Sequence, residues 1–378
     1  MRFILNLPLL IFGLILGISG ISLSLIRQQA PQSPGILFMS ERTGDAEIYL
    51  MRPDGSDQRR LTFRPGRDGA PIPNPAGGTA IFSSKQGRIW NLVQISLFGH
   101  KQQPLIRLSA LLKDPTLSPD GKTIFFGVTF RERVGPVNTA IAAIRPTTDE
   151  FRLMADTDTQ KTRLSLSPDG QWLVYAVPQN GLTDDLYLMH SDGTQLSHLM
   201  QATAFSTARW TPDSRALLVV TADAGNWDIQ QVALGSNQPV PLMDSTAYEW
   251  NPHVSPDGHW LLFQSDRDGN TEIYRMPLTG GDVERLTNDG GEDFIAEFSP
   301  DGKWILYTHD PDGPGSYTPD VWKMRADGSD KTRLTATQGV DVSPVWLPIQ
   351  DLPLRVWVFG FLSLLMLGFG LLSFRSSA

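Results

Sequence analysis

The chain has 378 residues, of which 40% are hydrophobic, and it carries a formal net charge of −8 at pH 7. It contains no cysteine, which excludes a disulfide framework, a thiolate metal site and a cysteine nucleophile. It also contains no block of Lys and Arg, so nucleic acid is not expected as a partner.

The chain begins with an apolar segment, residues 3–26, that carries no charged side chain. As an α-helix this segment is about 36 Å long, enough to cross a hydrocarbon core of about 30 Å. A cleaved signal peptide is the alternative, because Gly20-Ile21-Ser22 has the small-x-small form of a cleavage site. We expect an uncleaved transmembrane anchor at 3–26.

A four-residue turn then recurs along the chain. Copies of Ser-Pro-Asp-Gly or close variants begin at Ser118, Ser167, Thr211, Ser255 and Ser299, and a degenerate copy begins at Asn74. The copies stand about 44–49 residues apart, a period typical of one β-propeller blade. The chain is therefore expected to repeat one supersecondary unit.

The clearest unit lies between His253 and Thr287. An apolar strand at 260–264 follows the turn, and further strands are expected at 272–276 and 284–287. In the turn, Pro presets φ, Asp bonds to the local backbone, and Gly accepts a positive φ. Four short strands per unit form one propeller blade.

The apolar second strand occurs seven times, and its copies start near residues 36, 80, 123, 172, 216, 260 and 304. The first copy has no innermost strand before it, whereas 343–346 supplies an innermost strand with nothing after it. Joining these two ends in one mixed blade satisfies both open sheet edges. The sequence therefore predicts an all-β, seven-bladed propeller over 35–348, closed by strands from both ends of the chain.

A second apolar segment, residues 356–374, follows the last repeat and is bracketed by Arg355 and Arg375. It is also long enough to span a bilayer, so we expect a second transmembrane helix there. Two spans place both termini on one side of the membrane and the propeller on the other. The flanking charges favour an outside propeller only slightly.

The segments 265–274, 299–307 and 327–335 resemble the TolB-like family of WD-type β-propellers. The resemblance implies an extracytoplasmic propeller, which corresponds to the outer side of the plasma (inner) membrane. It also implies that the namesake of the family is a soluble, periplasmic, six-bladed protein. Because this chain has seven apparent blades and two apolar ends, we expect it to be a member of the TolB-like family but not the namesake protein itself.

No sequence motif predicts catalysis. The patterns Gly-x-Ser-x-Gly and His-Glu-x-x-His are absent, and Gly121-Lys122-Thr123 lacks the first glycine of a phosphate-binding loop. The loop 266–272 alternates oxygen donors but lacks the spacing of an EF-hand, which favours a polar turn over a calcium site. We therefore predict no enzyme activity, no cofactor and no metal.

Two ionisable residues are candidates for the central channel. His253 and Glu297 stand two residues before the turn in neighbouring repeats, and so share one register. A metal-dependent lyase or lactonase needs several converging ligands, so a packed or solvated pair is the simpler interpretation. A propeller enzyme or carbohydrate-binding protein that acts from the central funnel is the alternative function.

Acidic residues gather in the loops expected on the face opposite the repeated turns. The chain enters the ring at residue 36 and leaves it at 346, and both points are expected on the face that carries the repeated turns. Because the linkers to the apolar segments are short, this face should point toward the membrane. Candidate partner-binding residues on the opposite, membrane-distal face are Asp156, Asp158, Asp244, Glu249, Asp289, Glu292 and Asp293. The sequence thus predicts a membrane-tethered scaffold that contacts protein partners through its distal loops.

Overall fold

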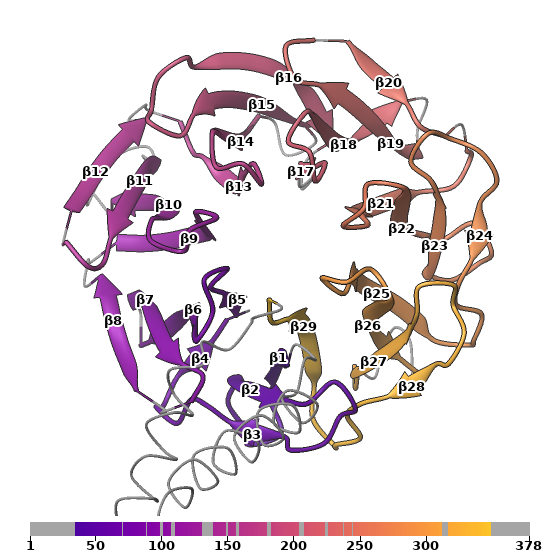
Figure 1. Ribbon diagram of the computed structural model, residues 1–378, viewed down its shortest axis with the longest axis horizontal. Helices are drawn as coiled ribbons and strands as arrows, with labels where there is room; N and C mark the ends of the chain where they lie inside the picture. Colours follow the sequence, from indigo (N-terminus) through magenta and orange to yellow (C-terminus); the bar gives the residue numbers. More distant parts are fainter. Residues whose placement is uncertain are drawn as a thin grey trace, which may run out of the picture. The chain divides into compact units, whose positions relative to one another are not determined.

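A computed structural model describes residues 35–348. Within this range it leaves out residues 70, 88, 99–100, 107–109, 131–138, 149, 156–158, 180–182, 204–207, 224–225, 237, 244 and 312–316. Seven antiparallel sheets stand around a central opening, six with four strands and one with five (Figure 1). The predicted all-β, seven-bladed propeller is confirmed.

Each blade begins with an innermost strand at the channel, and its other strands follow outward in order. Blade 1 contains β29 (Asp341–Trp346), β1 (Ile36–Ser40), β2 (Glu47–Met51) and β3 (Arg59–Arg60). In blade 2, β4 (Arg67–Asp68) and β5 (Ile72–Pro73) both pair with β6 (Thr79–Gln86), which is followed by β7 (Ile89–Ser96) and β8 (Gln102–Ile106). Blade 3 contains β9 (Ala110–Leu117), β10 (Ile124–Phe130), β11 (Thr139–Arg145) and β12 (Glu150–Ala155). Blade 4 contains β13 (Thr162–Leu166), β14 (Trp172–Pro178), β15 (Thr183–His190) and β16 (Ser197–Thr203).

The remaining three blades follow the same order. Blade 5 contains β17 (Arg209–Trp210), β18 (Ala216–Asp223), β19 (Asn226–Ala233) and β20 (Pro239–Pro241). Blade 6 contains β21 (Glu249–Val254), β22 (Trp260–Ser265), β23 (Glu272–Pro277) and β24 (Glu284–Arg285). Blade 7 contains β25 (Glu292–Phe298), β26 (Trp304–Asp310), β27 (Asp320–Arg325) and β28 (Thr332–Arg333).

Blade 1 closes the ring with strands from both ends of the described chain. β29 pairs antiparallel with β1, with Ile36 opposite Trp346 and Leu37 opposite Val345. The Leu347 amide donates to the Gly35 carbonyl at 2.8 Å, so the two ends of the ring stay adjacent beyond the strands. The predicted mixed closing blade is confirmed.

The repeated turn has the geometry that its residues predict. In the copy at Ser255, the Ser255 hydroxyl donates to Asp257 Oδ1 at 2.5 Å and accepts from the Trp260 amide at 2.9 Å. The Gly258 amide closes the turn onto the Ser255 carbonyl at 2.8 Å, with Gly258 at φ +77°. The hydroxyl of Ser255 is also the main reason that the pKa of Asp257 lies below its usual value.

The hydrophobic core lies between blades, because the second strand of each blade is covered on both faces. In β22, Phe263 packs with Leu218 of blade 5, whereas its neighbour Leu262 packs with Ile305 of blade 7. Side chains of a strand alternate between faces, so one apolar strand joins two interfaces. This packing explains the uninterrupted apolar runs in the sequence.

The ring has two distinguishable faces. We call the face that carries the turns between first and second strands the turn face. Because neighbouring strands are antiparallel, the connections between second and third strands, and those from one blade to the next, lie on the opposite side, which we call the loop face. Both ends of the described range, at Gly35 and Leu347, lie on the turn face.

Within the described residues 35–348, no helix combines the length and apolar character needed to cross a membrane. The predicted transmembrane helices at 3–26 and 356–374 fall outside the described residues. The structure therefore gives these flanking helices no support.

The ring closure makes a prediction about Arg42, which joins β1 to the buried Asp341 of β29 through a contact of 3.0 Å. Arg42→Met leaves a buried carboxylate without its cation, so we expect a loss of about 3 kcal/mol in the free energy of unfolding. Thermal and urea unfolding of the full chain in detergent would measure this loss.

Two further variants make that measurement specific. Arg52→Met removes an exposed ion pair and should leave the unfolding midpoint unchanged. Adding Asp341→Asn to Arg42→Met should restore part of the stability, because it removes the unpaired charge. Equal midpoints for Arg42→Met and wild type would contradict this account of the closure.

Candidate functional site

The predicted partner-binding residues do not all lie where the sequence suggested. Asp156, Asp158 and Asp244 fall outside the described residues. Asp289 and Glu292 lie at the loop face where the chain passes from blade 6 to blade 7, Asp289 exposed and Glu292 half-buried. Among the described candidates, these two are available at the surface.

Burial corrects the prediction for the other two candidates, Glu249 and Asp293. Glu249 is fully buried and forms an ion pair with Arg267 at 2.9 Å, while Ser265 donates to the same oxygen at 3.2 Å. Asp293 is also fully buried. These carboxylates belong to the interior, so neither can contact a partner directly.

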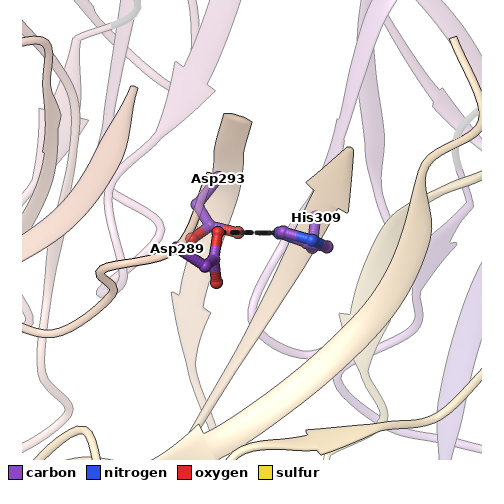
Figure 2. Close-up of side chains that lie close together, drawn as sticks. All are labelled: Asp289, Asp293 and His309. Carbon is purple, nitrogen blue, oxygen red and sulfur yellow. Dashed lines mark hydrogen bonds and ion pairs between the residues drawn. The ribbon is translucent and has the colours of Figure 1, made fainter. Parts of the chain in front are cut away.

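Asp293 instead forms a three-residue cluster with Asp289 and His309, as Figure 2 shows. Asp293 on β25 lies opposite His309 on β26 in the strand register. The imidazole Nδ1 of His309 lies 2.9 Å from Asp293 Oδ1 and 3.3 Å from Asp289 Oδ1. One ligand atom from each residue lies within 4.8 Å of the others, close enough to hold a metal ion.

The loop from β24 to β25 is held against the cluster by blade 6 and by a glycine. The side-chain amide of Asn270 donates to the carbonyls of Asp289 and Gly291. A Cβ on Gly291 would lie 2.6 Å from His309 Cε1 and 2.5 Å from the Asp310 carbonyl. Only glycine therefore lets the backbone pass this close to the imidazole.

Burial and mutual charge shift the titration of the cluster. Burial raises the pKa of Asp293 to about 6, although its hydrogen bond with His309 opposes that shift. The same hydrogen bond is the main reason that the pKa of His309 is raised. Trp322 meets the imidazole edge to face, with ring centroids 5.4 Å apart, and helps to orient it.

Sequence reasoning found Asp289 and Asp293 but missed His309. His309 lies 16 residues after Asp293, and only the pairing of β25 with β26 brings the two together. The one available signal was that His309 replaces the serine found at this position in the repeats at Ser40 and Ser265.

The innermost strands of blades 5, 6 and 7 carry a second group of ionisable residues. His253 and Glu297 occupy matching positions on β21 and β25, as predicted, and Arg209 occupies the same position on β17. Burial lowers the pKa of His253 to about 3 and raises that of Glu297 to about 7. The Arg209 charge lowers both of these pKa values. Glu297 accepts a hydrogen bond from the Trp346 amide at 2.9 Å.

Of Arg209, His253 and Glu297, only the histidine and the glutamate are of metal-ligating type. Across the part of the chain that the structure describes, the only three-residue group of metal-ligating side chains is the one at Asp289, Asp293 and His309. The sequence prediction did not include Arg209, because an arginine is not a metal-ligating residue.

Exposed aromatic side chains occupy the loop face between blades 5 and 6. Trp227 is 38% exposed and Tyr248 is 41% exposed. The two rings meet edge to face at 5.5 Å, and Trp227 meets Trp250 at 6.4 Å. The Tyr248 amide donates to Asp266 Oδ1 at 2.9 Å, so the loop that carries this tyrosine is anchored. We call Trp227, Tyr248 and Trp250 the aromatic group.

Residues 28–208 and 203–348 match the TolB beta propeller domain family. The chain belongs to this family. The match confirms the resemblance seen in the repeated segments, and its span includes all seven blades. No curated protein sequence matches the chain.

Solved structures with a similar fold include proteins of several kinds. TolB from Acinetobacter baumannii is 18% identical, with 80% of this chain and 79% of that chain covered and a TM-score of 0.53. A puromycin-hydrolyzing peptidase from Mycobacterium tuberculosis is 16% identical, with 81% and 54% covered and a TM-score of 0.64. An oligogalacturonate lyase in complex with manganese is 16% identical, with 76% and 85% covered and a TM-score of 0.63. At these identities the likeness shows the fold alone.

These neighbours overturn the prediction that the chain is not an enzyme. That prediction rested on the absence of familiar catalytic motifs from the sequence. A peptidase and a lyase nevertheless share the propeller fold. The fold and the missing motifs therefore do not exclude catalysis.

The raised pKa of His309 predicts a pH-dependent contribution to stability. A histidine with a folded-state pKa above its ordinary 6.5 stabilises the fold fully below pH 6.5 and loses that contribution as pH rises through the folded-state value. The variant His309→Asn keeps a hydrogen-bond donor but cannot become positively charged. The melting temperature of wild type should therefore exceed that of the variant most near pH 6 and least near pH 9.

The matched control is His259→Asn, because His259 is an exposed histidine beside Asp257. Its difference from wild type should stay small at every pH. Melting temperatures of the full chain in detergent from pH 6 to 9 provide the test. If the difference in melting temperature between wild type and His309→Asn did not change with pH, the charge of His309 would not contribute to stability.

Proposed function

We propose that the chain is a membrane-tethered propeller that binds a protein partner through its loop face. The observation that carries this proposal is the aromatic group at Trp227, Tyr248 and Trp250. Large aromatic side chains supply much of the binding energy in protein interfaces, and they do so best on a rigid support. Trp227 and Tyr248 stay exposed although the ring around them is closely packed.

The neighbouring surface adds negative charge to this aromatic group. Asp289 and Glu292 lie at the next blade junction on the same face. At the inner end of that junction, Phe294 stacks on Tyr317, which is 55% exposed, with ring centroids 6.3 Å apart. A partner segment with apolar anchors and basic flanking residues would complement this surface.

The apolar segments 3–26 and 356–374 are the proposed membrane tether. Gly35 and Leu347 are hydrogen-bonded to each other on the turn face, so both linkers would start from one point of the ring. Short linkers then favour a turn face directed at the bilayer and a loop face directed away from it. The relation to TolB-like propellers supports the extracytoplasmic side of the plasma (inner) membrane.

A paired substitution tests partner binding. The variant Trp227→Ala/Tyr248→Ala should lose most of its partner capture, because loss of an interface aromatic often costs about 2 kcal/mol or roughly 30-fold in affinity. The full chain would carry a photo-crosslinking residue in place of the half-buried Glu292 and be irradiated in native membranes. Crosslinked protein would be quantified by mass spectrometry.

Phe98→Ala is the matched control, because Phe98 is 70% exposed but lies in the connection between β7 and β8 on the turn face. It should capture the same protein as wild type. If the double variant and wild type crosslink equally, the aromatic group is not the binding surface.

A second candidate function is recognition of a carbohydrate or its chemical conversion in the central channel. The observation that favours it is the row formed by Arg209, His253 and Glu297 on three successive innermost strands. A carboxyl with a pKa near 7 is suited to proton transfer, and an arginine suits an acidic sugar. Glycan-array binding that is lost in Arg209→Gln would favour this function, and binding that survives the substitution would oppose it.

A further inference from the structure

We propose that Asp289, Asp293 and His309 form a binding site for one divalent first-row transition-metal cation, Zn²⁺ or Mn²⁺. The site lies on the loop face at the junction of blades 6 and 7. It goes beyond the proposed partner binding and requires no partner. The strongest support comes from how other blades neutralise the equivalent buried acid.

Two other blades use an arginine for that purpose. In blade 6, Arg267 forms an ion pair with the buried Glu249, which lies opposite Ser265 in the strand register. In blade 1, Arg42 forms the matching pair with the buried Asp341. Each arginine stands two residues after the serine at the end of the second strand, as in Ser265-Asp266-Arg267. The serine, the arginine and the buried acid thus form a repeated unit.

Blade 7 keeps the buried acid but lacks the arginine. Its corresponding segment is His309-Asp310-Pro311, so proline stands where the cation stands in the sister blades. Among the residues that the structure describes, His309 is the only cationic side chain in salt-bridge contact with Asp293. A further carboxylate, Asp289, is added beside the same imidazole.

The cluster of Asp289, Asp293 and His309 contains more negative than positive charge. Two carboxylates face one imidazole, so an unpaired negative charge remains even when the imidazole is protonated. Asp293 Oδ2 is buried and has no hydrogen-bond partner among the described residues, but this also holds for one oxygen of Glu249 and one of Asp341, so it is the missing arginine that sets blade 7 apart. A buried acceptor without a partner is costly and is normally paired or bound to an ion. A divalent cation in place of the imidazole proton would neutralise the remaining negative charge.

The distances already approach those of a metal site. Ligand atoms held about 2.0–2.2 Å from a tetrahedral ion lie about 3.3–3.6 Å from each other. His309 Nδ1 is 3.3 Å from Asp289 Oδ1 and 2.9 Å from Asp293 Oδ1. Shifts of a few tenths of an ångström would therefore make room for the ion.

The donor set identifies the class of ion. Imidazole nitrogen with two carboxylate oxygens suits Zn²⁺ and Mn²⁺ and leaves a fourth position open for water or a partner ligand. Ca²⁺ takes six to eight oxygen ligands, which the cluster does not provide. Because the exposed Asp289 forms the outer side, the ion can enter from the loop face.

Titration calorimetry of the metal-free full chain in detergent with ZnCl₂ would test the site. We expect one tight site per chain for wild type. Asp289→Asn and His309→Asn should each weaken that site by at least roughly tenfold, because each removes one of three ligands. MnCl₂ should bind to the same site, as shown by competition with Zn²⁺, whereas CaCl₂ should not compete.

His259→Asn controls for non-specific binding by exposed histidines, since His259 is 3.4 Å from Asp257 in an analogous surface pair. It should leave the tight site unchanged. The Asp289 side chain is 42% exposed, so Asp289→Asn should melt close to the wild-type temperature without metal. This variant therefore separates lost binding from lost folding. No tight site in wild type, or one that persists in both ligand variants, would overturn the proposal.

Discussion

The structure depends on the pairing of β29 with β1, because a propeller is stable only as a closed ring. Each blade packs its apolar faces on two neighbours, so an open ring would expose the cores of two blades and two unpaired strand edges. The strand pairing that sets Ile36 opposite Trp346, and the hydrogen bond from Leu347 to Gly35, join the ends of the ring. The closure also brings Gly35 and Leu347 together on the turn face.

A second constraint concerns the buried acid at the loop-face end of the innermost strand. Removing a carboxylate from water is costly unless a cation or several donors compensate for it. Arg42 and Arg267 meet this requirement in blades 1 and 6, and both also lie over aromatic rings, including Tyr49 and Tyr274. Blade 7 departs from this solution at His309. A departure from a repeated stabilising unit points to a role that the unit itself cannot fill.

The fold could be predicted because its signals are local. The turn at Ser255 is determined by residues within six positions of each other, and the apolar second strands need only a binary pattern. The site could not be predicted in the same way. His309 contacts Asp293 only because β25 pairs with β26. Glu249 was predicted to lie in an exposed loop, but it is buried in β21 and forms an ion pair with Arg267. Arg209 and His253 are related only because they occupy equivalent positions on the innermost strands of successive blades.

These differences change what the loop face presents to a partner. The sequence suggests a rim whose acids are all available, but Glu249 is neutralised internally and Asp293 is held by His309. A cation bound to the cluster would also remove the charge of Asp289, which would leave Glu292 as the main described acid at that junction. Attraction of a basic partner would then be weaker than the net charge of −8 implies. Recognition would depend more on Trp227 and Tyr248, whose apolar contacts are not screened by salt as ion pairs are.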